Sequence, residues 1–162
     1  MPVIAWIAEG TWPACVDAAR AHAPADADIV LLHVAGPDSP AAGHGAYAGL
    51  LGRGRLDRDP GTRLEELAAT SADQLLRDAA ERLGLPCTRL ERHGHIKHEV
   101  VAAAEGADLL VLARDGDRTH PGPKSLGPAG RFVVDHATCP VLLVWPHPAP
   151  GPGAPGIKDA SK

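Results

Sequence analysis

The chain has 162 residues, a net charge of −4 at pH 7 and 3% aromatic residues. This mild negative balance argues against general nucleic-acid binding, which needs a basic surface. No apolar run approaches the roughly 20 residues of a membrane helix. Three cysteines without paired spacing indicate neither a disulfide framework nor a zinc site. The start, MPVIAWIAEG, lacks the basic region of a secretory signal, so we expect a cytoplasmic protein.

The first half of the chain alternates apolar runs with a helical pattern. Residues 3–8 and 28–34 are nearly continuous apolar runs, which indicates strands buried on both faces of a parallel sheet. Between them, residues 11–22 have the pattern of a helix, with Pro13 in its first turn. Residues 35–61 are rich in Gly, Pro and Ala and lack a period, so we predict a long connection that is functional or disordered.

The second half continues the alternation. A helix is predicted to open with a capping box over residues 62–65 and to end at Gly84. A charged, alternating strand follows over 86–91, and its polarity suits a position near an edge of the sheet. The remaining predicted elements are a helix over 96–104, a strand over 108–112, a Gly/Pro-rich loop over 113–127, a helix from Gly127-Pro128 and a strand over 140–145.

This order of five strands and four helices predicts a single α/β domain over residues 1–146. Its sheet is expected to be doubly wound and parallel, with five strands and with helices on both faces. Ligands of such sheets bind at the carboxyl ends of the strands, where the strand order reverses. Residues 147–162 are rich in Pro and Gly and lack a period, which predicts a disordered tail.

Four stretches of the sequence are similar to the universal stress protein family. They are IAWIAEGT, IVLLHV, HGHIKHEVVAAAEGADLLVLARDG and SLGPAGRFVVDHATCPVLLVW. The last is the most specific, because a helix ending His-Ala-x-Cys-Pro leads into the final strand. The resemblance covers roughly residues 3–146. It implies the strand order 3-2-1-4-5 of adenine nucleotide α-hydrolase-like folds, a regulatory role in the stress response, and a homodimer joined through the last strand, Val141 to Trp145.

Many members of this family bind ATP through G-x-x-G, nine further residues and then G-[ST]. Glycines let the backbone approach phosphate, and helix-start N–H groups with a hydroxyl hold the anion. The pattern is altered here. Ala113 stands at the first glycine, whereas Gly116 and Gly127 match the others with one residue too many between them. Pro128 replaces the Ser or Thr, and the two lost donors could weaken affinity by about two to four decades.

The resemblance still implies an adenine-nucleotide site, with ATP as the expected ligand and Mg²⁺ as its companion. Glu9 takes the place of an Asp in the family, and Val34 matches the position that packs on adenine. The residues expected to build the site are Ala8, Glu9, Val34, Leu112, Ala113, Gly116, Gly127 and Pro128. The loop also carries polar side chains that could replace the lost phosphate donors or be no more than solvated groups: Arg114, Arg118, His120, Lys124 and Ser125.

Metal binding and catalysis have little support in the sequence. His93, His95 and His98 form H-x-H-x-x-H, a spacing that could converge on Zn, Ni or Cu. No Cys lies nearby, so we interpret them as surface histidines and predict no metal site. No G-x-S-x-G or H-E-x-x-H motif occurs, and we expect a binding module rather than an enzyme, with slow nucleotide hydrolysis as an open alternative. The other alternative is a dimeric interaction platform that binds no nucleotide, which Pro128 favours.

Overall fold

A computed structural model of the protein describes residues 1–36 and 60–148. The predicted connection over 35–61 and the predicted tail over 147–162 lie almost entirely outside these residues. The elements follow one another as β1 (Pro2–Trp6), α1 (Trp12–His22), β2 (Asp28–Ala35), α3 (Pro60–Leu83), β3 (Cys87–His93), α4 (Ile96–Ala103), β4 (Leu109–Ala113), the 3₁₀ helix η2 (Pro123–Ser125), α5 (Pro128–His136) and β5 (Val141–Val144).

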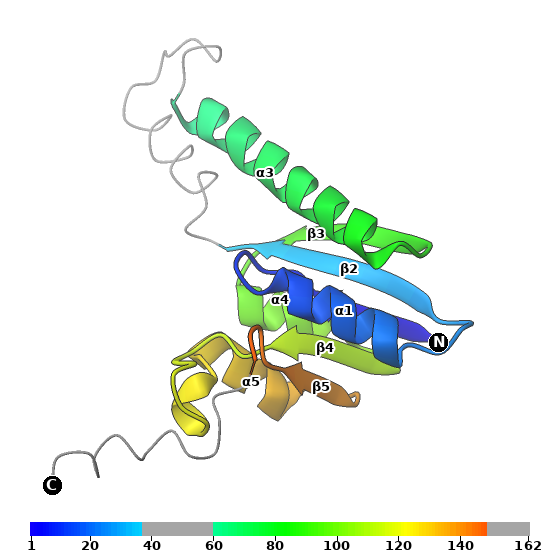
Figure 1. The fold of residues 1–162 in the computed structure, drawn as a ribbon. Coiled ribbons are helices and arrows are strands. Elements are labelled where there is room, and N and C mark those ends of the chain that lie inside the picture. Colours follow the sequence, from blue (N-terminus) through cyan, green and yellow to red (C-terminus); the bar gives the residue numbers. More distant parts are fainter. Residues whose placement is uncertain (37–59, 149–162) are drawn as a thin grey trace, which may run out of the picture.

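The five strands form one parallel sheet in the order β3-β2-β1-β4-β5 (Figure 1). β1 is central, since Val3 pairs with Ile29 of β2 on one side and with Leu109 of β4 on the other. The strand order reverses between β1 and β4, which places the expected ligand crevice at the carboxyl ends of these two strands. The predicted fold class and the strand order implied by the family resemblance are confirmed.

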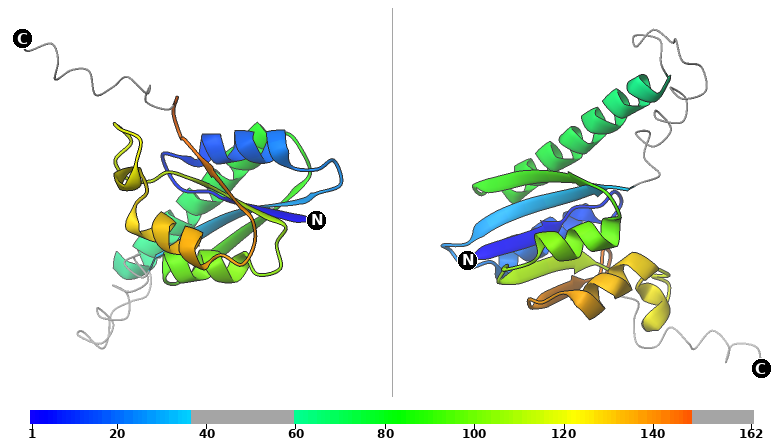
Figure 2. Two further views of the ribbon diagram at one scale, coloured as in Figure 1. Left: turned by 90° about the horizontal axis from the view of Figure 1, so that it is seen from below. Right: turned by 180° about the vertical axis from the view of Figure 1, so that it is seen from behind.

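Side chains of the central strands alternate between two apolar layers, because successive residues of a strand point to opposite faces. Val3, Ala5 and Ile7 pack with α1 and α3. Ile4 and Trp6 pack with α4 and α5. Figures 1 and 2 show these two pairs of helices on opposite faces of the sheet. The result is a three-layer domain whose core is mainly aliphatic on both sides.

Local sequence features explain where several helices and strands begin or lie in the sheet. α5 begins at Pro128 as predicted, where the missing N–H costs little. α3 begins at Pro60, before the predicted opening at 62–65, because Pro is also compatible with a first helical turn. β3 pairs only with β2 and is an edge strand, as its charged pattern predicts. No helix within residues 1–36 and 60–148 is long and apolar enough to cross a membrane.

Candidate functional site

The turn after β1 lies at the carboxyl edge of the sheet and exposes Glu9. Gly10 has a φ of +85°, a left-handed conformation that favours glycine, and it lets the chain turn from β1 toward α1. Beside this turn, Nδ1 of His33 donates a 2.9 Å hydrogen bond to the carbonyl oxygen of Ile7. Because a carbonyl only accepts, the proton stays on Nδ1, and Nε2 is an acceptor in the neutral ring.

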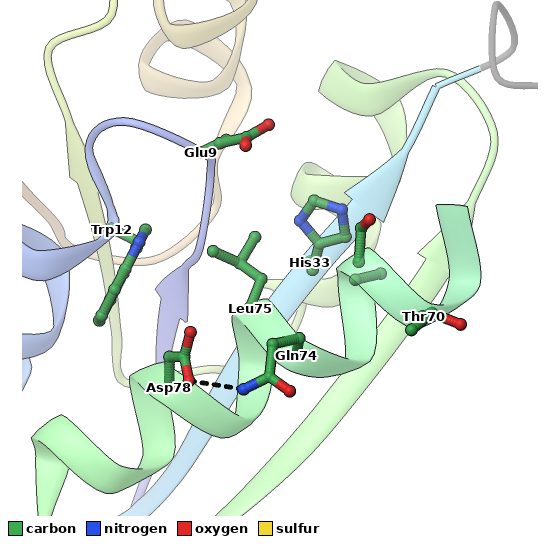
Figure 3. Close-up of a pocket in the computed structure, with 9 residues that line it drawn as sticks. Glu9, Trp12, His33, Thr70, Gln74, Leu75 and Asp78 are labelled. Atoms are coloured by element: carbon green, nitrogen blue, oxygen red, sulfur yellow. Dashed lines mark hydrogen bonds between the residues drawn. The ribbon is translucent and has the colours of Figure 1, made fainter. Parts of the chain in front are cut away.

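A pocket of about 680 Å³ opens beside this turn. Figure 3 shows its lining side chains coming from the β1–α1 turn, from α1, from β2 and from α3. Trp12 and Leu75 offer apolar surface, while the carboxylates of Glu9 and Asp78 are acceptors. The amide of Gln74 donates to Asp78 Oδ1 over 2.7 Å. The complete lining is Glu9, Trp12, His33, Thr70, Ser71, Ala72, Gln74, Leu75 and Asp78. This chemistry suits a planar, uncharged ring system with N–H or O–H donors.

Glu9 is the one residue of this pocket that the sequence analysis included. Trp12 had a usable signal, because a Trp in the first turn of a helix that follows a strand end lies near the carboxyl edge of a sheet. The contribution of α3 had no such signal. Helical spacing shows that Thr70, Gln74 and Asp78 share one side of α3, but it does not show that this side faces the ends of β1 and β2.

The loop after β4 folds back on itself through Gly116. The Gly116 N–H donates to the Ser125 carbonyl over 2.9 Å, and the Asp117 N–H donates to the Lys124 carbonyl over 2.7 Å. A Cβ on Gly116 would lie 2.3 Å from the Lys124 carbonyl oxygen, so only glycine allows this approach. The loop therefore returns to the end of β4 and delivers Gly127 and the start of α5 to that edge.

Two of the predicted phosphate contacts are engaged with each other. Arg114 donates from Nη1 to the Ser125 Oγ over 2.5 Å, and its guanidinium lies 4.6 Å from the centre of the Trp145 ring. Ser125 is fully buried. Lys124 is exposed, and in the part of the chain that the structure describes Arg118 has a buried Nη1 without a hydrogen-bond partner. Lys124 and Arg118 are therefore candidate cations for an anion, and the buried Nε of Arg114 likewise has no hydrogen-bond partner among the described residues.

Several predicted site residues contribute core side chains. Val34, Leu112 and Ala113 have exposed fractions of 4%, 0% and 6%. Val34 and Leu112 pack in the layer beneath α4 and α5, whereas Ala113 packs beneath α1 and α3. Ala8 is half-buried, and its carbonyl already accepts the Trp12 N–H over 3.0 Å. Contacts from Val34, Leu112 and Ala113 to a ligand would therefore come mainly from their backbone groups.

The start of α5 is occupied by a side chain that the sequence analysis did not consider. The Gly127 N–H donates to Asp115 Oδ1 over 2.7 Å. Gly127 is buried, and Pro128, the next residue, is exposed and has no N–H to offer. The signal in the sequence was the Asp directly after Arg114 in a loop that precedes a helix, since carboxylates commonly accept from helix-start N–H groups.

The histidines of the H-x-H-x-x-H stretch lie at the carboxyl end of β3 and at the start of α4. His93 and His95 are exposed, and the rings of His95 and His98 are 6.1 Å apart at nearly right angles. The rings of His98 and Phe132 also pack at a steep angle with centroids 4.9 Å apart, and both residues line a pocket of about 360 Å³ between α4 and α5. Within residues 1–36 and 60–148, no three His, Cys, Asp or Glu side chains lie close enough together to hold a metal ion.

The cysteines are poorly suited to act as nucleophiles. Burial raises the pKa of the Cys15 thiol to about 12, with a smaller opposing effect from a backbone hydrogen bond to Ala113. Burial also raises the pKa of Cys87 and of Cys139 above the usual range for a thiol. The thiolate is the reactive form, so all three cysteines are protonated near neutral pH.

Several solved structures share this fold. The hypothetical protein MJ0577 is 16% identical with a TM-score of 0.65, over 89% of this chain and 94% of that chain. A universal stress protein in complex with cAMP is 16% identical with a TM-score of 0.61, over 91% and 98%. The universal stress protein UspA from Lactobacillus plantarum is 20% identical with a TM-score of 0.57, over 89% and 97%. These similarities show a shared fold.

The family itself is shown by the sequence. No protein of curated function matches this chain. The model of the universal stress protein family matches residues 9–144, from the turn after β1 to the end of β5. This match includes Glu9, the loop through Gly116 and Gly127, and the start of α5. The chain belongs to the universal stress protein family.

Proposed function

We propose that this chain is a stress-response regulatory module that binds an adenine nucleotide at the carboxyl edge of β1 and β4. The observation that carries the proposal is the loop after β4, which folds back through Gly116 and returns the N-terminus of α5 to the end of that strand. Backbone N–H groups at a helix start are a general phosphate site. The universal stress protein solved with cAMP supports a nucleotide as the class of ligand.

The two parts of this edge suit the two ends of a nucleotide. The pocket beside Glu9 would take the base and ribose, because Trp12 offers a ring face and the Glu9 carboxylate accepts hydroxyl protons. The loop between Gly116 and Gly127 would face the phosphates, with Lys124 and Arg118 as candidate cations. Binding would order the loop, and a partner would respond to that order.

Binding rather than catalysis is the proposed activity. The raised pKa values of the three cysteines support this, since they leave no thiolate nucleophile at neutral pH. The test is release of phosphate from ATP with Mg²⁺. Turnover that exceeds a control without protein and disappears in Glu9→Ala would instead establish slow hydrolysis.

A specific observation favours the alternative of an interaction platform without nucleotide. The Gly127 N–H is already bonded to Asp115, and Pro128 supplies neither an N–H nor a hydroxyl. Under this alternative, the domain binds other proteins and no nucleotide.

We also propose a homodimer joined through the strand β5. This edge strand pairs with β4 on one side, and its four residues are apolar and half-buried. An apolar strand with a free edge is usually covered by another chain or element. A second copy of this chain would cover it by pairing strand to strand from Val141 to Trp145.

Calorimetric titration with ATP and with adenosine tests the nucleotide proposal. We expect both ligands to bind, and Glu9→Ala to weaken both by about tenfold, since a hydrogen bond to a charged group is worth about 1.5–3 kcal/mol. Glu81→Ala is the matched control, because Glu81 is an exposed carboxylate near the far end of α3 and does not line the pocket. Equal effects of the two variants would contradict the assigned site.

A further inference from the structure

Asp115 places a negative charge where the proposed site would hold phosphate. Its Oδ1 accepts the Gly127 N–H over 2.7 Å, directly before the first residue of α5. An anion at a helix N-terminus interacts favourably with the partial positive charge there. The carboxylate therefore has both the charge and the hydrogen-bond partner that a phosphate oxygen would have.

Two glycines let the carboxylate come this close. A Cβ on Gly127 would lie 3.0 Å from Asp115 Oδ1, and a Cβ on Gly130 would lie 2.8 Å from the same atom. Both glycines are buried, whereas Asp115 is exposed. The first turn of α5 thus forms a cradle for an anion, and the chain fills this cradle with its own side chain.

Two neighbouring arginines donate to acceptors other than this carboxylate. The nearby Arg114 guanidinium donates to Ser125 and lies over Trp145. Arg131, in the first half of α5, donates from Nη2 to the Pro123 carbonyl over 2.7 Å. The bond between Asp115 and Gly127 is therefore the contact that an incoming phosphate would have to displace.

We infer that Asp115 is a specificity-determining residue that occupies the phosphate position and biases the site against polyphosphate ligands. The preferred ligands are adenine compounds with one phosphate or none. ATP binds only when it displaces the carboxylate or places its phosphates away from the N-terminus of α5. This inference rests on the proposed function, because it assigns the ligand class of the same site. A phosphate brought to the same position would be repelled by the like charge of the carboxylate.

The test compares ATP, AMP and adenosine by calorimetry on wild-type protein, Asp115→Asn and Asp117→Asn. Asn keeps an oxygen that accepts the Gly127 N–H, so the variant should retain the fold of the loop. Asp117 is the control of matched charge, since its carboxylate lies in the same loop but accepts from the N–H and hydroxyl of Thr119. We expect Asp115→Asn to tighten ATP by about tenfold or more and to leave adenosine unchanged.

The possible results are separable. If Asp117→Asn tightens ATP as much as Asp115→Asn does, or if adenosine gains as much as ATP, the assignment to Asp115 is overturned while nucleotide binding stands. If none of the three ligands binds any of the proteins, the proposed function fails. In that case pyrophosphate is titrated into wild-type protein and into Asp115→Asn while the Gly127 amide signal is followed by NMR. If pyrophosphate shifts this signal in Asp115→Asn but not in wild-type protein, the inference is supported. If it shifts the signal in neither protein, the inference is overturned.

Discussion

Arg114 and Ser125 are joined by a 2.5 Å hydrogen bond from the guanidinium to the hydroxyl, at the base of the loop that follows β4. The same hydroxyl donates to the Gly122 carbonyl over 2.6 Å, and the guanidinium covers the ring of Trp145 just after β5. One buried serine thus connects the loop, β4 and the end of β5. These bonds hold the base of the loop together.

Replacing Ser125 by Ala should destabilise the protein by about 1–3 kcal/mol, because it removes the hydroxyl that accepts from the half-buried Arg114 guanidinium and donates to the Gly122 carbonyl. Chemical denaturation measures this loss. Ser71→Ala, an exposed site on α3, should change the free energy of unfolding by less than about 0.5 kcal/mol. Equal effects of the two variants would show that the bond to Arg114 adds nothing.

Gly116→Ala should disrupt the loop, because the new Cβ would lie 2.3 Å from the Lys124 carbonyl oxygen and backbone must move. We expect a loss of about 1–3 kcal/mol of stability and changed amide signals between Asp117 and Gly127. In Gly10→Ala nothing lies within 4 Å of the new Cβ, and only the left-handed backbone is strained. That variant should leave the loop signals in place. Unchanged loop signals in Gly116→Ala would contradict the close approach.

Pro128→Ser should tighten ATP binding, because it restores an N–H and a hydroxyl at the first position of α5. Each donor to a charged oxygen is worth about 1.5–3 kcal/mol, so a gain of about one decade or more is expected. Adenosine affinity should stay unchanged, which serves as the internal control in the same calorimeter. If ATP gains nothing, the loop between Gly116 and Gly127 does not contact phosphate.

The stability of the protein should fall in alkaline solution through Cys15, whose pKa is raised by burial to about 12. The unfolded thiol ionises near its ordinary pKa, whereas the folded thiol keeps its proton. The contribution is therefore fully present below about pH 9 and is lost as the pH rises toward 12, by up to about 1.4 kcal/mol per pH unit. Denaturation between about pH 9 and pH 11 measures the slope. Cys15→Ala should show a shallower slope, and an equal slope would refute the assignment.

The proposed dimer can be tested at Leu143. The carbonyls of Pro140 and Val144 accept hydrogen bonds from β4, so by alternation the N–H of Leu143 points to the free edge of β5. Leu143→Pro removes this donor, whereas Leu143→Ala trims the side chain and keeps it. We expect sedimentation to give a dimer for wild-type protein and Leu143→Ala, and a monomer for Leu143→Pro. A monomeric wild-type protein at micromolar concentration would exclude the dimer.

Most of the fold could be predicted from the sequence because its strands are unusually explicit. The runs that became β2 and β4 are apolar at nearly every position, and only strands covered on both faces tolerate this. Helix boundaries were less certain. Pro60 and residues 62–65 are both compatible with the start of a helix, and local sequence preference does not decide which of them begins α3.

The site was predictable only in part. Gly116 and Gly127 could be predicted because a close backbone approach requires glycine, and both match glycines of the family motif, although with one residue too many between them. The pocket wall from α3 and the bond between Asp115 and Gly127 were not visible. Both depend on how segments distant in the sequence meet, and neither helical period nor motif spacing contains that information.

The central claim is that this edge of the sheet binds an adenine nucleotide. The most direct measurement is mass spectrometry of the ligand released when the purified protein is denatured, followed by titration of the emptied protein with ATP, AMP and adenosine. The account predicts an adenine compound in the released fraction and saturable binding of at least adenosine or AMP. No released nucleotide and no heat with any of the three ligands at millimolar concentration would contradict it.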